Sequence, residues 1–291
     1  MTQKRGIRST VPYLLLVPFL LFLALFLYGV INAILEGFGL MPSLGLTALT
    51  TDYYAKAFTG SDLSASILYS LYLAGVSSII AIILGIVISA AVTRARLGQV
   101  GQLAGIQIPI MTSHSVAVLF IISMFAGTGL VARALYAGGI IADTTTFPTV
   151  VGAVSGWGII LVYVWKEAPF VAFCIITLMA HMGDRYAEAA ACLGANPLQT
   201  FFAVTLPLCR GALTKAFLVI FAFAFGSYEV PFLLGATLPK ALPVLAYIEF
   251  QSPDLLNRPY AMAINGIMAV IALALSIVYF LVIRREGREA R

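Results

Sequence analysis

Long apolar runs alternate with less apolar segments along the whole chain. The runs occupy residues 11–32, 65–92, 103–126, 149–182, 211–234 and 260–283. A helix needs about 20 apolar residues to cross the hydrocarbon core of a bilayer, and a lipid-exposed backbone must satisfy its own hydrogen bonds. The pattern therefore predicts an all-α polytopic membrane protein with six transmembrane helices in a single transmembrane domain, residues 1–291.

The fourth of these runs is exceptionally long, and the fifth contains residues that should break a helix. As one helix, the run from Thr149 to Met182 would be about 50 Å long, more than the roughly 30 Å hydrocarbon core. We expect it to tilt or to kink at Pro169. Gly226, Pro231 and Gly235 should break the outer half of the fifth run. The polar segments at 36–64, 127–147 and 239–258 are expected to be loops.

The first run follows a basic segment that carries Lys4, Arg5 and Arg8. A secretory signal peptide is the alternative interpretation. The apolar run is longer than the usual 7–15 residues of such a peptide, and no small-residue cleavage site follows it promptly. We expect an uncleaved first span.

Composition narrows the class of protein. The chain is 61% hydrophobic and 10% charged, with a mean hydropathy of +1.02, whereas soluble domains carry about 25% charged residues. The net charge of +5 does not indicate a nucleic-acid partner, because the basic residues gather at the ends of apolar runs. Cys174, Cys192 and Cys209 lack metal-ligand spacing and should be free thiols.

Lysine and arginine are distributed unequally between the two sides of the predicted membrane. Twelve of the seventeen lie on the termini, the segment after the second run and the segment at 185–215, and four lie on the other side. The last, Lys166, lies inside a run. Because basic residues favour the cytoplasmic side, both termini are predicted to be cytoplasmic.

The segment 185–207 has the local signals of two short helices joined by a tight turn. The Ala-rich stretch from Arg185 to Leu193 favours a helix. Gly194 follows it, where a left-handed cap suits only glycine well, and Asn196-Pro197 can start the next helix. Ala187, Ala190, Ala191 and Gly194 would form a small-residue face; the alternative is an ordinary loop helix.

The fixed positions in this segment are Glu188-Ala189-Ala190, then Gly194 after three residues, Val204 after nine more, and Leu206-Pro207. This pattern resembles the EAA loop of permease subunits of bacterial binding-protein-dependent type I ABC importers, with Val204 where that family has Ile. The resemblance implies a cytoplasmic coupling helix that docks on an ATPase. The residues expected to form this coupling site are Arg185, Tyr186, Glu188, Ala189, Ala190, Leu193, Gly194, Asn196 and Pro197.

The role of Glu188 has a second interpretation, since an acid in the first helical turn also favours the helix dipole.

The resemblance also implies the partners. The chain contains no phosphate-binding loop of the GxxxxGK[ST] type and no metal-ligand cluster, so we expect no enzyme activity and no bound cofactor or metal. ATP and Mg²⁺ would lie on two partner ATPase subunits. A second permease subunit, an extracytoplasmic solute-binding protein and the lipid of the bacterial inner membrane complete the expected partners.

Ionisable residues inside apolar runs are costly and usually line a cavity. Glu229 lies beside the breaks in the fifth run, and Lys166 and Glu167 lie within the fourth. One hypothesis is a Lys166–Glu229 pair that acts as a gate. The alternatives are that Glu229 reaches outer water while Lys166 snorkels, or that the three residues relay ions in a secondary transporter.

Polar and aromatic residues near these positions complete the expected solute pathway. Tyr163, Trp165 and Tyr228 could form an aromatic wall that stacks on a cation, although such residues more often pack between helices. The remaining candidates are His114, Ser227 and Asn265. The segments WKEAPF, FGSYEVPFLLG and LPVLAY resemble the spermidine/putrescine, opine and aminoethylphosphonate branch of the family, which implies a small cationic or zwitterionic solute.

Overall fold

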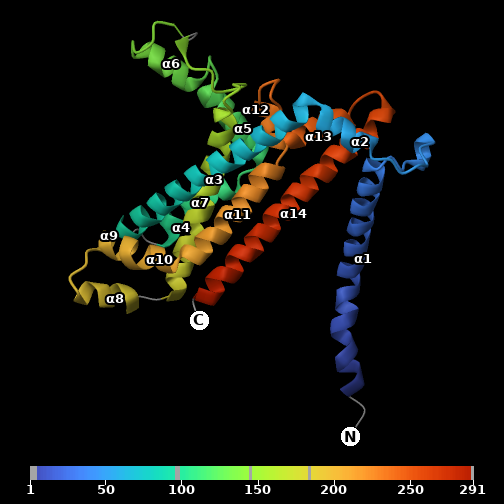
Figure 1. Ribbon diagram of the computed structural model, residues 1–291. Helices are drawn as coiled ribbons and strands as arrows, with labels where there is room; N and C mark the ends of the chain where they lie inside the picture. Colours follow the sequence, from blue (N-terminus) through green and yellow to red (C-terminus); the bar gives the residue numbers. More distant parts are fainter. Residues whose placement is uncertain (1–4, 96–98, 144–145, 183–184, 290–291) are drawn as a thin grey trace. The chain divides into compact units, whose positions relative to one another are not determined.

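The computed structural model describes residues 5–95, 99–143, 146–182 and 185–289. Over these residues the regular structure is helical, apart from an isolated bridge between Met41 and Leu46 (Figure 1). Five helices are long and apolar enough to cross a membrane, or up to 6 if a bent pair counts as one span. The all-α membrane fold expected from the sequence is confirmed.

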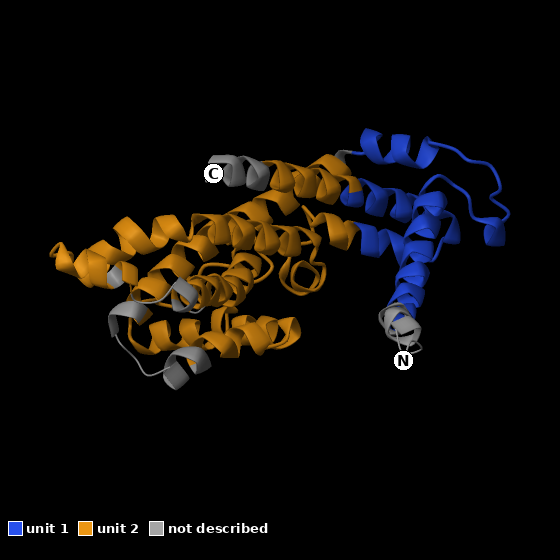
Figure 2. Ribbon diagram, turned by 90° about the horizontal axis from the view of Figure 1, so that it is seen from below, with its two compact units in different colours: residues 1–60, 246–269 blue, residues 61–245, 270–291 orange. Residues whose placement is uncertain are grey.

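The helices, with the bounds used below, are α1 (Arg5–Gly37), α2 (Asp52–Thr59), α3 (Ser61–Ala95), α4 (Gln99–Met111), α5 (His114–Phe125), α6 (Leu130–Ala137), α7 (Trp157–Met182), α8 (Arg185–Cys192), α9 (Pro197–Thr200), α10 (Leu206–Leu208), α11 (Arg210–Gly226), α12 (Glu229–Leu234), α13 (Leu242–Phe250) and α14 (Arg258–Glu289). They form two compact units, residues 1–60 with 246–269, and residues 61–245 with 270–291 (Figure 2). The expectation of a single transmembrane domain stays a prediction.

In the larger unit, α3 packs closely on α7 through small side chains. Ser77, Ala81, Gly85 and Ser89 recur every four residues on α3, and all four are buried. A four-residue spacing places them on one face of the helix. A Cβ added at Gly85 would lie 2.6 Å from the side chain of Val171. Small residues at a membrane helix interface allow this close approach of the backbones.

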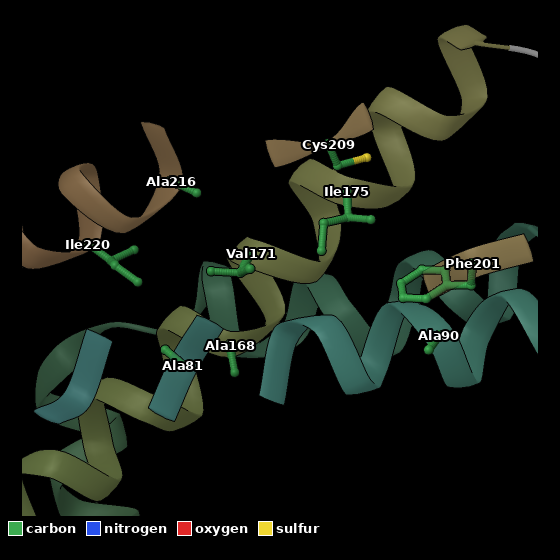
Figure 3. Close-up of a cluster of buried hydrophobic side chains, with 9 residues drawn as sticks. All are labelled: Ala81, Ala90, Ala168, Val171, Ile175, Phe201, Cys209, Ala216 and Ile220. Carbon is green, nitrogen blue, oxygen red and sulfur yellow. The ribbon is translucent and has the colours of Figure 1, made fainter. Parts of the chain in front are cut away.

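A cluster of buried apolar side chains joins this helix pair to the segment that leads into α11 (Figure 3). Ala81 and Ala90 come from α3, and three residues come from α7. Phe201, which is 2% exposed, belongs to the π-helical turn η3 (Phe201–Thr205). Cys209 follows α10 and is fully buried. The chain between α8 and α11 is therefore anchored on the core of the unit.

The sequence suggested one continuous helix in the third apolar run, but the structure shows two. It breaks at Thr112 and Ser113, between α4 and α5. The Ser113 hydroxyl caps α5 by accepting a hydrogen bond from the Val116 amide at 3.4 Å. The candidate span in this region begins at His114, not at residue 103.

The fourth run is shorter than expected. Its helix α7 begins at Trp157 and contains 26 residues, about 39 Å at 1.5 Å per residue. Gly152 and Gly156, with φ of 71° and 69°, hold the preceding residues in turns. The helix predicted to start at Thr149 is therefore wrong, because the left-handed backbone at these glycines is not helical and α7 starts only after them, at Trp157.

Each of the three expected loops contains a helix. Residues 36–64 include the end of α1 and all of α2, residues 127–147 include α6, and residues 239–258 include α13. Helices α2, α6 and α13 contain 8, 8 and 9 residues, too few to stand out in a pattern of runs of about 20 residues.

Candidate functional site

Helix α8 and the turn after it have the geometry that their residues predict. Gly194 has φ of +82°, and its amide donates to the Ala191 carbonyl at 2.9 Å. Asn196 and Gln199 form a reciprocal capping box, with both hydrogen bonds at 2.9 Å. The expected left-handed cap and the start of the second helix at Pro197 are confirmed.

The exposed face of α8 is apolar at its centre. Leu193 is 89% exposed and Tyr186 is 52% exposed, and Ala189 is also exposed. Tyr186 and Ala189 are three residues apart on α8 and share one helix face, and Leu193 is the first residue after the helix. Ala190 does not belong to this face, in contrast to the expectation, because it is 7% exposed and packs within its own chain.

The other coupling candidates surround this face. Arg185, Glu188, Asn196 and Pro197 are exposed. Of the expected small-residue set, Ala191 and Gly194 are exposed, while the side chain of Ala187 lies outside the described part of the structure.

A bend joins this segment to α11. The helices of Pro197–Leu208 and Arg210–Gly226 meet at 69°. Pro207 lacks an amide hydrogen and weakens helical hydrogen bonding at this point, and Cys209, with ψ of −2°, separates the two helices. The connection between α8 and α11 thus contains this bend and is anchored on the core by Phe201 and Cys209.

The charged residues of the fourth run line a cavity of about 270 Å³. Its walls come from the α4–α5 break, α7 and α11. The lining residues are Ile110, His114, Tyr163, Lys166, Glu167, Phe170, Val219, Ile220 and Phe223. Although Lys166 and Glu167 are neighbours that point about 100° apart on the helix, both reach this cavity.

Glu167 and Lys166 have different surroundings. Glu167 is 5% exposed, and within the described residues neither of its carboxylate oxygens has a hydrogen-bond partner. The Lys166 ammonium donates to the Thr112 carbonyl. That carbonyl lies just beyond the C-terminus of α4, where a cation interacts favourably with the helix dipole.

Glu229 is the first residue of α12, beyond the break at Gly226 that the sequence predicted. The break predicted at Pro231 is wrong, because Pro231 lies in the first turn of α12, where proline is tolerated, and the helix continues to its C-cap at Gly235.

The Glu229 carboxylate accepts a hydrogen bond from the Ser115 hydroxyl of α5. In the described part of the chain it forms no ion pair with Lys166, although the two charges are close enough to interact. The expected direct pair is therefore not formed, because each residue has a different partner.

The expected aromatic wall is also not assembled. Trp165 stacks on Phe120 with ring centroids 5.9 Å apart, and Tyr228 packs on Phe232 at 5.8 Å. Tyr163 does line the cavity and is 1% exposed. The structural reason is that Trp165 packs on a ring of the neighbouring helix α5, and Tyr228 packs on a ring of α12, the helix that it caps.

The remaining candidates divide between the two units. His114 packs on Phe223 with centroids 5.1 Å apart, and Ser227 lies in the connection between α11 and α12. Asn265 lies on α14 in the smaller unit, so it is not assigned to this cavity.

Sequence reasoning missed Thr112, Ser115 and Phe223. A serine at the N-cap position is a recognised signal for the start of a helix. Ser113 could therefore have revealed the break between α4 and α5 that brings Thr112 and Ser115 into the site. Among the described residues there is no group of three or more His, Cys, Asp or Glu side chains that could hold a metal.

Comparison with known proteins relates this architecture to transport proteins. The probable sulfate transport system permease protein cysT of Prototheca wickerhamii is 27% identical over 170 residues, which are 58% of this chain and 63% of that protein. The molybdenum transport system permease protein ModB of Azotobacter vinelandii is 27% identical over 40% of this chain and 51% of its own length. The matches thus span less than two thirds of either relative.

Solved structures agree on the fold. A bacterial ABC transporter that imports the acidic polysaccharide alginate matches 96% of this chain and 96% of its own, with a TM-score of 0.77 and 18% identity. The MetNI methionine ABC transporter in an inward-facing conformation matches 76% of this chain with a TM-score of 0.57 and 16% identity.

The family match itself covers residues 103–287, well over half of the chain. These residues include the cavity-lining helices, α8 with its Gly194 turn, and the bend before α11. The chain belongs to the family of binding-protein-dependent transport system inner membrane components.

Proposed function

We propose that the chain is the membrane-spanning permease subunit of an ATP-driven importer and forms half of a solute pathway. The observation that carries this proposal is the exposed apolar surface at the end of α8, where Leu193, the first residue after the helix, is 89% exposed beside the Gly194 turn. An apolar residue so exposed on a helix bordered by charged side chains is suited to a groove on a partner protein. Membership of the family supports the same role.

The fold suggests how the partner would act. Helix α8 docks on an ATPase subunit, with Tyr186, Ala189 and Leu193 packing in its groove and Arg185 and Glu188 at the rim. ATP and Mg²⁺ bind to that subunit. When two ATPases close, α8 is displaced, and the bend at Cys209 transmits the displacement to α11 and the cavity wall. Such rigid-body movement switches access from one side to the other.

Three partners complete the assembly: a second permease chain, a pair of ATPases and an extracytoplasmic solute-binding protein. Because lysine and arginine gather on the side of α8, we place both termini and α8 in the cytoplasm of a bacterial cell with the chain in its inner membrane.

The solute is proposed from the residues alone. A small cationic or zwitterionic compound suits the acids Glu167 and Glu229. The names of the relatives refer to sulfate and molybdenum and give no support to the polyamine, opine or aminophosphonate branch. Nor do the comparisons support an ion-coupled transporter.

Co-purification tests the proposed function. The tagged chain, extracted gently from its native membrane, should bring a P-loop ATPase with it. Leu193→Asp should abolish most of this association, since it places a charge in a packed interface. The matched control is Leu256→Asp, a 57% exposed leucine in the 3₁₀ turn Leu255–Asn257, which should retain the ATPase. A stable chain without any ATPase, whose transport follows an ion gradient, would refute the proposal.

A further inference from the structure

Glu167 is a buried acid to which the fold gives no partner. It lies on α7 and is 5% exposed, and neither of its carboxyl oxygens has a hydrogen-bond partner among the described residues. Its side chain lines the cavity of about 270 Å³ between α7 and α11. A buried polar group without a partner is rare in a folded protein and calls for an explanation.

The surroundings of Glu167 favour its neutral acid form. An ionised carboxylate costs far more to remove from water than a neutral acid does, so an unpaired acid keeps its proton in an apolar site. Lys166 does not compensate, although it is the next residue. It points about 100° away on the helix, donates to the Thr112 carbonyl and interacts with the charge of Glu229. Glu167 therefore offers the cavity one O–H donor and a carbonyl acceptor.

The rest of the cavity wall is largely apolar and aromatic. Val219 and Ile220 contribute aliphatic side chains, and Phe170 and Phe223 contribute rings. Phe223 is held against His114 with ring centroids 5.1 Å apart. Small-molecule sites have this composition, with a mostly apolar lining and a few polar groups that fix the orientation of the ligand. The volume lies at the small end of such sites, which suits a compound of few heavy atoms.

A neutral acid discriminates between the groups that a solute can present to it. A methyl group would leave both of its oxygens without a partner, and an ammonium group, which only donates, would leave its O–H unused. An aliphatic hydroxyl or a primary amide both donates and accepts, so either can bond to the carbonyl and to the O–H of the acid.

From this geometry we infer that Glu167 recognises a neutral hydroxyl or amide group of the solute and thereby determines specificity in the pathway. The inference rests on the proposed function and narrows its substrate class. The small cationic or zwitterionic solute also carries a neutral group that donates and accepts hydrogen bonds.

The test uses the chain with its co-purified partners in lipid nanodiscs and measures binding by calorimetry. The probes are pairs of similar shape that differ in the polar group. Ethanolamine is compared with propylamine, and serine with 2-aminobutyrate, because a methyl replaces the hydroxyl in each pair. Glycinamide is compared with isobutylamine, and asparagine with leucine, because an apolar branch replaces the amide. In at least one pair the polar member should bind about fivefold or more tightly, since its apolar counterpart leaves the buried acid without a partner.

Two variants separate a hydrogen bond from a charge at this position. Glu167→Gln has no charge but keeps a donor and an acceptor, so the preference for the polar probe should persist. Glu167→Met removes both and should bind the two members of that pair equally. Neither variant buries a new charge, so both should fold. The matched control is Glu249→Met on α13, outside the residues that line the cavity, and it should keep the preference.

Infrared spectroscopy gives a readout that does not depend on any solute. The unchanged chain should show the carbonyl band of a protonated carboxyl group, and this band should be missing from the spectrum of Glu167→Gln. The band should remain in Glu249→Met.

Any of four results would overturn the inference: no polar probe binds more tightly than its apolar counterpart, the preference is lost in Glu167→Gln, it persists in Glu167→Met, or the infrared band is absent from the unchanged chain. The ATPase that accompanies each variant is measured in parallel. If the ATPase is retained while one of these results is obtained, the inference fails and the importer function stands. If even the unchanged chain brings no ATPase, the importer function fails, whatever the cavity binds.

Discussion

The contact between α3 and α7 predicts a specific cost for one added methyl group. In Gly85→Ala the new Cβ would lie 2.6 Å from the Cβ and Cγ1 of Val171 and 2.9 Å from the carbonyl oxygen of Ala168. Carbon atoms in ordinary contact are about 3.5–4.0 Å apart. Neither neighbour can rotate away, because a carbonyl and a Cβ are fixed to their backbone, so the two helices must separate by about 1 Å.

Overpacking of this kind costs about 1–3 kcal/mol, offset by the roughly 0.5–1 kcal/mol gained when alanine replaces glycine in a helix. The chain supplies a matched control on the same helix, since a Cβ at Gly75 would meet nothing closer than a Phe221 ring atom at 4.0 Å. Gly75→Ala should therefore be neutral or slightly stabilising.

Thermal unfolding of both variants in the same detergent, followed by circular dichroism, measures the difference. Gly85→Ala should melt several degrees below the unchanged protein, and Gly75→Ala at or above it. Equal melting temperatures for the two variants would refute the claim that close backbone approach, and not helix propensity, determines the residue at position 85.

The same reasoning gives three further predictions. Gly152→Ala and Gly156→Ala both strain a left-handed backbone by about 1–2 kcal/mol, but only a Cβ at Gly156 would meet α3, at 2.5 Å. The unfolding free energy of Gly156→Ala should therefore be lower than that of Gly152→Ala by about 1–3 kcal/mol, and its melting temperature should be lower too. Identical melting temperatures for the two variants would contradict this. Asn196→Ala removes the cap of α9 and should cost about 1 kcal/mol locally, seen as faster hydrogen exchange after the Gly194 turn; unchanged exchange would exclude the cap. Ser115→Ala leaves the Glu229 carboxylate without this donor and should slow transport about tenfold or more, since such a bond contributes about 1.5–3 kcal/mol. Transport at the unchanged rate would mean that the Ser115–Glu229 contact between α5 and α12 does not contribute to the transport cycle.

Much of the α8 turn could be predicted because its causes are local. Gly194 adopts φ of +82° since glycine alone has no Cβ to clash in that conformation. The Asn196 side chain accepts a hydrogen bond from the amide of Gln199, three residues later, so its role as a helix cap can be deduced from the spacing. The burial of Ala190 could not be predicted, because which face of α8 meets the rest of the chain depends on how the segment through Phe201 packs on α3 and α7.

The sequence by itself determined that the chain crosses a membrane through helices, because bilayer thickness sets the length of each apolar run. It also determined the glycine turn and the break near Glu229, which depend on backbone preferences of single residues. Only the tertiary structure decided the partners of the charges. Lys166 meets Thr112 across 54 positions and Ser115 meets Glu229 across 114, and such contacts depend on helix packing angles and breaks that no local pattern encodes. For the same reason, the sequence could not show that Lys166 and Glu167 line one cavity, because α7, α11 and the α4–α5 break enclose it together.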